Sequence, residues 1–247
     1  MHPILLKLGP ITIYSYGVMV AAGFSLAAFL VYRRAPKFDM DRDRMIDCLI
    51  LILISGVAGA RVLYVLLNFE YYRANLTEIL NLSGGGLVWY GGFAAAFFTS
   101  IWFSKRRDLN FWSVSDLIAP YIALGQAFGR VGCYLNGCCY GIIAPDYFLS
   151  GERHPTQIYS AILLLIIFIV LVKWQNKRRF KGEIFLGYCA LYSCKRFFIE
   201  FLRADNPKIF LKLTMSQLIS AAVFLTALII FKIKADEWGK KASSGSK

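Results

Sequence analysis

The chain has 247 residues, of which 57% are hydrophobic and only 17% are charged, and its formal net charge is +13. An ordinary soluble domain is about half apolar and a quarter charged. The composition therefore excludes an intrinsically disordered chain and argues against a soluble enzyme. The positive charge fits either a nucleic-acid-binding protein or a membrane protein with basic cytoplasmic loops, and its position along the chain distinguishes the two.

Apolar stretches that approach the roughly 20 residues needed to cross a membrane recur along the chain. In chain order, these seven stretches are residues 13–32, 46–67, 87–103, 114–128, 158–172, 184–202 and 213–231. No basic cluster precedes the first one, and it is longer than the core of a typical signal peptide, so we interpret it as a retained helix. Residues 1–235 are expected to form a single integral membrane domain, followed by a polar cytoplasmic tail at 236–247.

The basic residues concentrate in alternate connections between these stretches. Residues 33–44, 105–107, 173–181 and the tail from 232 hold most of the 28 Lys and Arg residues. This positive-inside pattern places the N-terminus outside and the C-terminus in the cytoplasm. It also accounts for most of the net charge without nucleic acid. The predicted fold class is all-α, a polytopic membrane protein with about seven transmembrane helices.

Two glycine-rich segments are expected on the outer side. In residues 81–93 (NLSGGGLVWYGGF), five glycines surround Trp89 and Tyr90. Glycine lets the backbone approach a ligand closely, but it equally permits tight packing of membrane helices, and the pattern leaves both open. Residues 125–141 (GQAFGRVGCYLNGCCYG) are expected to leave the short stretch 114–128 as irregular backbone. Such backbone occurs at membrane depth only where it lines a cavity inside the protein.

Ionisable residues within the apolar stretches are candidates for a functional site. Arg196 and Glu200 are four residues apart, so they share one helix face and can pair, and Tyr192 extends that face. The alternatives are a structural ion pair and, for Arg130, a side chain that reaches the lipid headgroups. Arginine and aromatic residues at headgroup depth suit a phosphate attached to acyl chains, because Arg binds phosphate bidentately. Those expected in the outer half of the membrane are Tyr16, Arg61, Tyr90, Arg130, Tyr192 and Arg196.

An ordered set of motifs runs through nearly the whole chain. They are GPITIYSYGVM, GARVLYV, GGGLVWYGGF, DLIAPYIALGQAFGRVGCYLNGCCYG, RHPTQIY and GYCALYSCKRFFIEFLR. In this order they resemble the prolipoprotein diacylglyceryl transferase family of bacterial membranes. The family signature corresponds here to Gly129, Arg130, Asn136, Gly137 and Gly141.

The resemblance implies an enzyme that moves the diacylglyceryl group of phosphatidylglycerol to the lipobox cysteine thiol of a prolipoprotein. The product is a thioether, and glycerol phosphate is released. By the same resemblance, Arg130 and Arg196 bind the lipid phosphate and Glu200 holds Arg196. The site faces the outer side of the bacterial cytoplasmic (inner) membrane. Further expected substrate contacts are Tyr16, Tyr192, Arg61, Asn136, Gly91, Gly92, Gly137 and Gly141.

The expected partners are phosphatidylglycerol, prolipoprotein signal peptides with a lipobox, and the membrane. No cofactor, metal or nucleic acid is expected. Two other functions stay open. One is a divergent relative with a different lipid donor or acceptor. The other is a non-enzymatic lipid or peptide transporter or membrane chaperone, since such proteins also bury charges among helices.

Three positions depart from the family pattern. Tyr90 stands where the family has the His of an HGG motif, Cys133 replaces an Asn, and Cys138 replaces an acidic residue. The base that activates the acceptor thiol is therefore not identified. His154 is one candidate, and its alternative is a surface or hydrogen-bonded histidine. Tyr90 can donate a hydrogen bond, but it is a poor base with a reference pKa of about 10.

The cysteines at 133, 138 and 139 have three interpretations. The first is packing or an oxidised pair, either Cys133–Cys138 or Cys133–Cys139, on an oxidising side of the membrane. The second is a catalytic or sensing thiol. The third is a metal site, for which the spacing C-x4-C-C without a nearby His is weak support. Cys189 and Cys194 are expected to be small packing residues.

Overall fold

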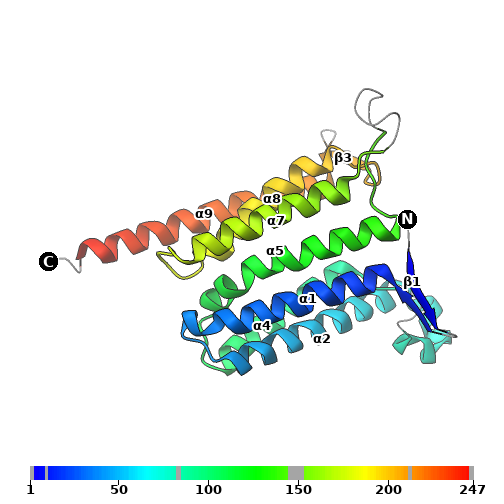
Figure 1. Ribbon diagram of the computed structural model, residues 1–247, viewed down its shortest axis with the longest axis horizontal. Helices are drawn as coiled ribbons and strands as arrows, with labels where there is room; N and C mark the ends of the chain where they lie inside the picture. The colour runs from blue at the N-terminus through cyan, green and yellow to red at the C-terminus, as the bar shows by residue number, and fades with distance from the viewer. Residues whose placement is uncertain (1–2, 9–10, 82–84, 144–152, 211–212, 245–247) are drawn as a thin grey trace. The chain divides into compact units, whose positions relative to one another are not determined.

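The computed structural model describes residues 3–8, 11–81, 85–143, 153–210 and 213–244, which are mostly helical (Figure 1). The helices are α1 (Ser15–Arg34), α2 (Arg42–Leu67), α3 (Phe69–Ala74), α4 (Trp89–Arg106), α5 (Phe111–Asn136), α7 (Thr156–Gln175), α8 (Glu183–Glu200) and α9 (Met215–Ser244). Short 3-10 helices cover Ala35–Phe38 and Leu76–Leu80. Strands β1 (Ile4–Leu8) and β2 (Ile11–Tyr14) form an antiparallel hairpin, as do β3 (Lys208–Phe210) and β4 (Leu213–Thr214).

A long helix covers each of the apolar stretches predicted from the sequence. Four of these helices, α1, α2, α7 and α9, are long and apolar enough to cross a membrane. The mostly helical class and the presence of membrane-spanning helices are confirmed, whereas the count of seven spans stays a prediction. Helix α9 continues past the apolar stretch to Ser244, so much of the predicted polar tail is helical.

The prediction of irregular backbone after residue 128 is wrong, because α5 continues without a break to Asn136. The glycines of this segment bring helices together instead of ending one. A Cβ added at Gly132 would lie 3.1 Å from Cδ2 of Tyr16 in α1, and one added at Gly23 would lie 2.6 Å from Cβ of Phe128. Small residues at such contacts are typical of membrane helices, and here they let α5 pack against α1.

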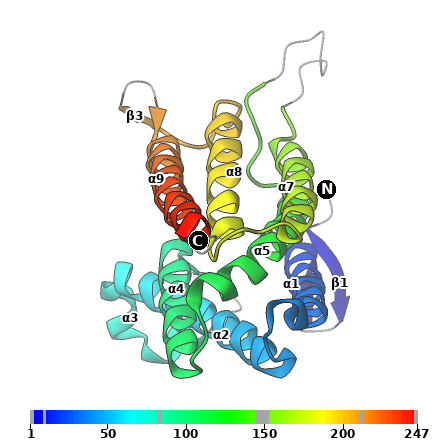
Figure 2. The same cartoon turned by 90° about the vertical axis from the view of Figure 1, so that its left-hand side faces the viewer.

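The described chain forms two compact units, residues 1–30 with 115–247 and residues 31–114. In the first unit α7, α8 and α9 run alongside one another, as both views show (Figures 1 and 2). Its core is built from small residues of α5 facing larger residues of α7 and α8. The buried members are Ala119, Ala123, Ala127, Leu164, Ile167, Leu171, Ile184 and Tyr188.

A buried carboxylate of α5 caps the start of α8. Asp116 Oδ2 accepts a hydrogen bond from the backbone N–H of Gly182 at 2.7 Å, and Oδ1 accepts from those of Ile184 and Phe185, both at 2.9 Å. The first N–H groups of a helix have no partner within the helix, so an external acceptor stabilises that end. This cap fixes where α8 begins and therefore helps to place the residues near its other end.

Gln175, at the end of α7, replaces a backbone hydrogen bond that α5 lacks at its proline. Pro120 has no N–H, so it cannot bond the Asp116 carbonyl one turn earlier. The Gln175 side chain supplies the missing donor, with Nε2 at 2.7 Å from that carbonyl oxygen and 3.2 Å from the carbonyl oxygen of Leu117. Together with the Asp116 cap, this contact joins α5, α7 and α8 at one end of the unit.

In the second unit, α2 and α4 pack through glycines. A Cβ added at Gly59 would lie 2.6 Å from the carbonyl oxygen of Gly91, and one added at Gly92 would lie 2.8 Å from that of Gly56. The sequence left open whether the glycines near Tyr90 serve a ligand or helix packing. For Gly91 and Gly92 the structure shows tight helix packing, and their contact with substrate stays a prediction.

Candidate functional site

The candidate site lies in the first unit, at the end where Figure 1 shows β3. Three connections meet there: the loop after α5, the segment before α7 and the segment after α8. The backbone N–H of Gly141 donates to the carbonyl of His154 at 2.9 Å, and that of Ile142 donates to the carbonyl of Leu202 at 2.9 Å. A Cβ at Gly141 would lie 2.5 Å from the Leu202 carbonyl oxygen, so only glycine permits this junction.

The Asn-Gly pair of the family signature ends helix α5. Gly137 has φ +79°, and its N–H donates to the Tyr134 carbonyl at 3.2 Å. The N–H of Cys138 donates to the Cys133 carbonyl at 3.1 Å. These two bonds form a Schellman motif, which needs a left-handed residue directly after Asn136. The motif turns the chain so that Cys138 comes back beside the last turns of α5.

Arg196 and Glu200 of α8 form the ion pair that their spacing predicted. Arg196 Nη2 lies 3.1 Å from Glu200 Oε2 and also donates to Ser216 Oγ of α9 at 2.9 Å. The Glu200 side chain is fully buried and accepts a further hydrogen bond from Thr214 Oγ1 at 2.9 Å. A buried carboxylate with several donors is fixed in place, so it orients the guanidinium group of Arg196.

Basic side chains outnumber carboxylates at this end of the unit. Arg130, Lys195, Arg196 and Arg203 interact electrostatically, and the nearby carboxylates are Glu200 and Asp205. Arg203 lies 3.9 Å from Glu200 and donates hydrogen bonds from Nε and Nη2 to the two carboxylate oxygens of Asp205, which lowers the pKa of the Asp205 carboxyl. Among the residues that the structure describes, Arg130 forms no ion pair with a carboxylate. The surplus positive charge favours an anionic ligand here.

Two of the predicted tyrosines lie near this basic cluster. Tyr16 of α1 packs beside Gly132 and is close enough to Arg130 for their charges to interact. The Lys195 ammonium lies 4.8 Å from the centre of the Tyr192 ring, a cation–π arrangement. Tyr16, Arg130, Tyr192, Arg196 and Glu200 thus all lie in the first unit, and their role as a phosphate site stays a prediction.

His154 is hydrogen-bonded. Its Nδ1 lies 3.4 Å from the hydroxyl oxygen of Tyr159 in the first turns of α7. Its backbone N–H and carbonyl both take part in the junction with Gly141 and Ile142. The geometry matches the alternative of a hydrogen-bonded histidine, and a role of His154 as the thiol-activating base stays a prediction.

The thiols of Cys133, Cys138 and Cys139 form a compact group in which all sulfur atoms lie within 4.8 Å of one another. All three are free, partly buried thiols. A hydrogen bond with the Cys133 thiol, together with the positive charges of Arg203 and Arg130, lowers the pKa of Cys139 to about 5 against the effect of partial burial. Partial burial raises the pKa of Cys138. The neighbouring thiol and the two arginines therefore favour the thiolate form of Cys139.

In the second unit, Arg61 is engaged by the backbone. All five of its N–H groups point at carbonyl oxygens of the connection between α3 and α4, at 2.7 to 3.1 Å. Arg61 fixes this connection beside an open cavity of about 430 Å³, and its contact with substrate stays a prediction. The accepting carbonyls are those of Glu78, Ile79, Asn81, Gly85 and Gly86.

Tyr90 lies in the first turn of α4, also in the second unit. Its side chain is exposed, and its ring meets that of Trp89 edge to face, with the ring centres 5.4 Å apart. Its part in catalysis stays a prediction.

The sequence interpretation left out several residues of the site. Arg203 was counted only as a loop charge, and it does lie beyond the end of α8, yet its side chain returns to within 3.9 Å of Glu200. Thr214 and Gln217 form a capping box at the start of α9, with reciprocal side-chain to backbone bonds of 2.9 and 3.3 Å. The T-x-x-Q pattern signals this cap, but nothing in the sequence indicates that Thr214 also donates to Glu200.

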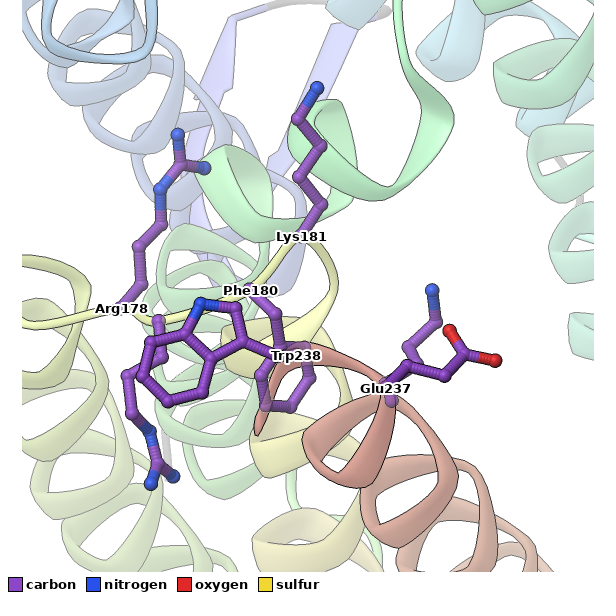
Figure 3. Close-up of a pocket in the computed structure, with 7 residues that line it drawn as sticks. Arg178, Phe180, Lys181, Glu237 and Trp238 are labelled. Carbon is purple, nitrogen blue, oxygen red and sulfur yellow. The ribbon is translucent and has the colours of Figure 1, made fainter. Parts of the chain in front are cut away.

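A second basic region lies at the opposite end of this unit. A cavity of about 440 Å³ lies between the α7–α8 connection and the last turns of α9. In Figure 3, the side chains of Arg178 and Lys181 point the same way, away from the Trp238 indole. Basic and tryptophan side chains are typical of the cytoplasmic border of a membrane protein. The lining residues are Arg178, Arg179, Phe180, Lys181, Lys234, Glu237 and Trp238.

Comparison with known proteins decides the family. The sequence profile of the family "Prolipoprotein diacylglyceryl transferase" matches residues 3–233. The chain belongs to this family. It is 32% identical over 247 residues to the phosphatidylglycerol–prolipoprotein diacylglyceryl transferase of Bacillus mycoides, covering 94% of this chain and 91% of the relative. The enzyme of the same name from Geobacillus kaustophilus is 32% identical over 254 residues, with 96% and 94% covered.

A third relative of that name, from Bacillus velezensis, is 32% identical over 247 residues, covering 93% of this chain and 90% of the relative. The resemblance predicted from the sequence is thus confirmed. Membership of the family also supports the transferase class, the link to lipoprotein biosynthesis and the location in a membrane.

Proposed function

We propose that this protein transfers the diacylglyceryl group of phosphatidylglycerol to the lipobox cysteine thiol of prolipoproteins. Relatives that share about a third of its residues carry the name of this activity. The observation that carries the proposal is the basic end of the first unit, where Arg130 has no carboxylate partner among the described residues and Arg196 is oriented by Glu200. A phosphodiester that enters from the membrane supplies the missing negative charge.

In the proposed reaction, the acceptor thiol loses its proton and the sulfur attacks the glycerol carbon that carries the phosphate. A C–S bond forms as the C–O bond to phosphate breaks, and the electron pair leaves with glycerol phosphate. Negative charge therefore grows on the phosphate oxygens. Arg130 and Arg196 stabilise that charge, and one such positioned donor is typically worth about 3–4 kcal/mol of activation free energy.

Both substrates reside in the membrane, which favours their encounter in one orientation. The positive-inside pattern puts the ends that carry Arg130 and Arg196 on the outer side of the cytoplasmic membrane. A prolipoprotein presents its lipobox on that side after translocation, so the site and the acceptor meet at the same depth. The buried polar contacts of Glu200 keep Arg196 oriented before the lipid arrives.

Arginine replacement tests this site. We expect Arg130→Ala or Arg196→Ala to abolish transfer from phosphatidylglycerol to a lipobox peptide in vesicles, measured as the mass increase of the peptide. A matched control is Arg73→Ala, because the Arg73 side chain is 62% exposed and its ion-pair partner among the described residues is the exposed Glu70. The control variant is expected to retain full activity.

Full activity in both site variants would contradict the assignment of Arg130 and Arg196. A wild-type protein that moves lipid or peptide across vesicle membranes without forming a covalent product would contradict the proposed reaction itself and identify a transporter.

A further inference from the structure

The proposed reaction lacks an identified group that removes the proton of the acceptor thiol. Tyr90 is a poor base, and His154 is hydrogen-bonded to Tyr159. The cluster of Cys133, Cys138 and Cys139 lies close to Arg130, near enough for their charges to interact. This is an unusual concentration of thiols beside a phosphate site, and the reaction as proposed does not use it.

The backbone holds the three thiols in place. The Schellman motif at Gly137 returns the chain toward Cys133, and Cys139 adopts a left-handed conformation with φ +66°. Two buried side chains at the start of α7 fix the loop from the other side. Thr156 Oγ1 donates to the Cys139 carbonyl at 2.8 Å, and Gln157 Nε2 donates to the Cys138 carbonyl at 2.6 Å.

The spacing of the thiols fits a metal ion with soft ligands. Zinc binds thiolates at about 2.3 Å, which places the sulfur atoms of a tetrahedral site about 3.8 Å apart. The sulfur atoms here lie within 4.8 Å of one another, so small side-chain adjustments suffice. Three protein ligands leave the fourth position open, which is the arrangement of catalytic zinc sites.

We propose that Cys133, Cys138 and Cys139 bind a zinc ion whose open position takes the acceptor thiol of the lipobox cysteine. The inference rests on the proposed transferase function and departs from the sequence expectation that no metal takes part. Zinc would take the place of a general base, because a thiol that coordinates zinc loses its proton.

The charges around the cluster agree with such a centre. Three thiolates and one Zn²⁺ leave one net negative charge, and a fourth thiolate adds another. Arg130 and Arg203 interact electrostatically with Cys139 and compensate for this charge. Arginines alone would repel a dication. Beside three thiolates, they instead offset the net negative charge of the zinc–thiolate centre.

The step balances without a further reactant. The acceptor thiol gives its proton to solvent as the sulfur binds zinc. The zinc-bound sulfur then attacks the glycerol carbon, the C–S bond forms, and the C–O bond breaks with its electron pair on glycerol phosphate. The thioether is a weaker ligand than the thiolate and leaves the zinc, which returns the site to its starting state.

Metal binding is tested on the whole protein in detergent under reducing conditions, without lipid or peptide. We expect about one zinc ion per chain, and replacement by Co²⁺ is expected to give the near-ultraviolet charge-transfer absorption of Co²⁺–thiolate bonds. Cys139→Asn removes one thiolate ligand and should lose both signals. Asn is chosen because it tolerates the left-handed conformation at that position. Cys139→His keeps a metal ligand and should restore zinc binding. The control Cys194→Ser, which changes an exposed cysteine of α8, should bind zinc as the wild type does.

Adding an acceptor peptide tests the open position. A lipobox peptide with cysteine is expected to shift the Co²⁺ absorption bands, whereas the same peptide with serine in place of cysteine leaves them unchanged. The proposal is overturned if the reduced wild-type protein binds no more zinc or cobalt than Cys139→Asn, or if the cysteine peptide leaves the Co²⁺ spectrum unchanged. A disulfide within the cluster that persists under the reducing conditions would also overturn it.

These measurements separate the zinc proposal from the proposed function. Peptide transfer that proceeds at the full rate after chelation has removed all zinc would refute the role of zinc and leave the transferase function intact. A zinc site that binds the cysteine peptide in a protein without transfer activity would support the site and refute the function.

Discussion

Glu200 is the residue on which the basic end of the first unit depends. It is fully buried, yet it pairs with Arg196 at 3.1 Å, lies 3.9 Å from Arg203 and accepts a hydrogen bond from Thr214. A buried charge is tolerated only when it is paired and hydrogen-bonded, and loss of one partner leaves the other uncompensated. Glu200 itself does not contact the reacting atoms in the proposed mechanism, so it is a positioning residue.

Replacing Glu200 separates this positioning role from catalysis. Glu200→Gln keeps acceptors for Thr214 but removes the charge that orients Arg196. We expect kcat/KM for phosphatidylglycerol to fall about 10- to 100-fold, which corresponds to about 1.4–2.7 kcal/mol, mostly through a higher KM. Steady-state kinetics of peptide lipidation measure the split between the two constants.

Two further variants make that result specific. Glu200→Asp retains the charge and should recover part of the lost affinity for the lipid. Glu70→Gln changes an exposed carboxylate of the second unit and should behave as the wild type. A kcat/KM for Glu200→Gln equal to that of the wild type would show that Arg196 does not need its carboxylate partner.

At the scale of elements, glycine sets how closely helices approach. Gly91 in α4 packs against the backbone of Gly59 in α2, and Gly92 faces Gly56 in the same way. Because lipid provides no hydrophobic drive for helices to associate, close backbone packing is the main source of stability between them. A side chain at such a contact must push the two helices apart.

The contact is tested by comparing two glycines. Gly91→Ala places a methyl group against the Gly59 carbonyl and is expected to destabilise the protein by about 1–3 kcal/mol, as overpacking does. Thermal unfolding in detergent should show the lower midpoint. Gly17→Ala in α1 is the control, since a Cβ there meets nothing within 4 Å. If both variants melted together, the α2–α4 contact would not limit stability.

The elements also show what the sequence can and cannot specify. Apolar runs located every long helix, and i, i+4 spacing predicted the Arg196–Glu200 pair. The run of glycines and polar residues from 125 to 136 was misinterpreted, because a sequence does not show that glycines in a helix face a neighbouring helix. The hydrogen-bond partners of Arg61 could not be predicted for a related reason. Its partners are backbone carbonyls, which every sequence contains and which only the folded chain brings together.

At the scale of the whole molecule, the distribution of basic residues predicts how the chain is oriented in the membrane. The segments at 33–44, 105–107 and 173–181 are basic, whereas the connection between α2 and α4 contains Arg73 as its sole basic residue. Loops rich in Lys and Arg stay in the cytoplasm during insertion. This bias predicts the orientation of the chain and, with it, the side of the membrane on which Arg130 and Arg196 act.

Reporter fusions in living bacteria test that orientation. Alkaline phosphatase is active only outside the cytoplasm. Green fluorescent protein fluoresces in the cytoplasm and does not fluoresce when it is exported unfolded. We expect phosphatase activity for fusions made after Arg73. Fluorescence is expected for fusions made after Arg107 and at the C-terminus. A C-terminus that reports the outer side would refute the predicted odd number of spans.

The Asp116 cap and the Gln175 contact have a consequence for biogenesis. Each satisfies backbone groups of a helix far away in the chain: Asp116 serves α8, and Gln175 serves α5. While the ribosome is still making α8, a lone α5 has an unbonded carbonyl at its proline, and a newly made α8 has unbonded N–H groups until it reaches Asp116. Unsatisfied backbone groups are strongly disfavoured in hydrocarbon. These backbone groups are therefore satisfied only once α5, α7 and α8 are together, so the last of the three helices to be made completes the hydrogen bonding of the first.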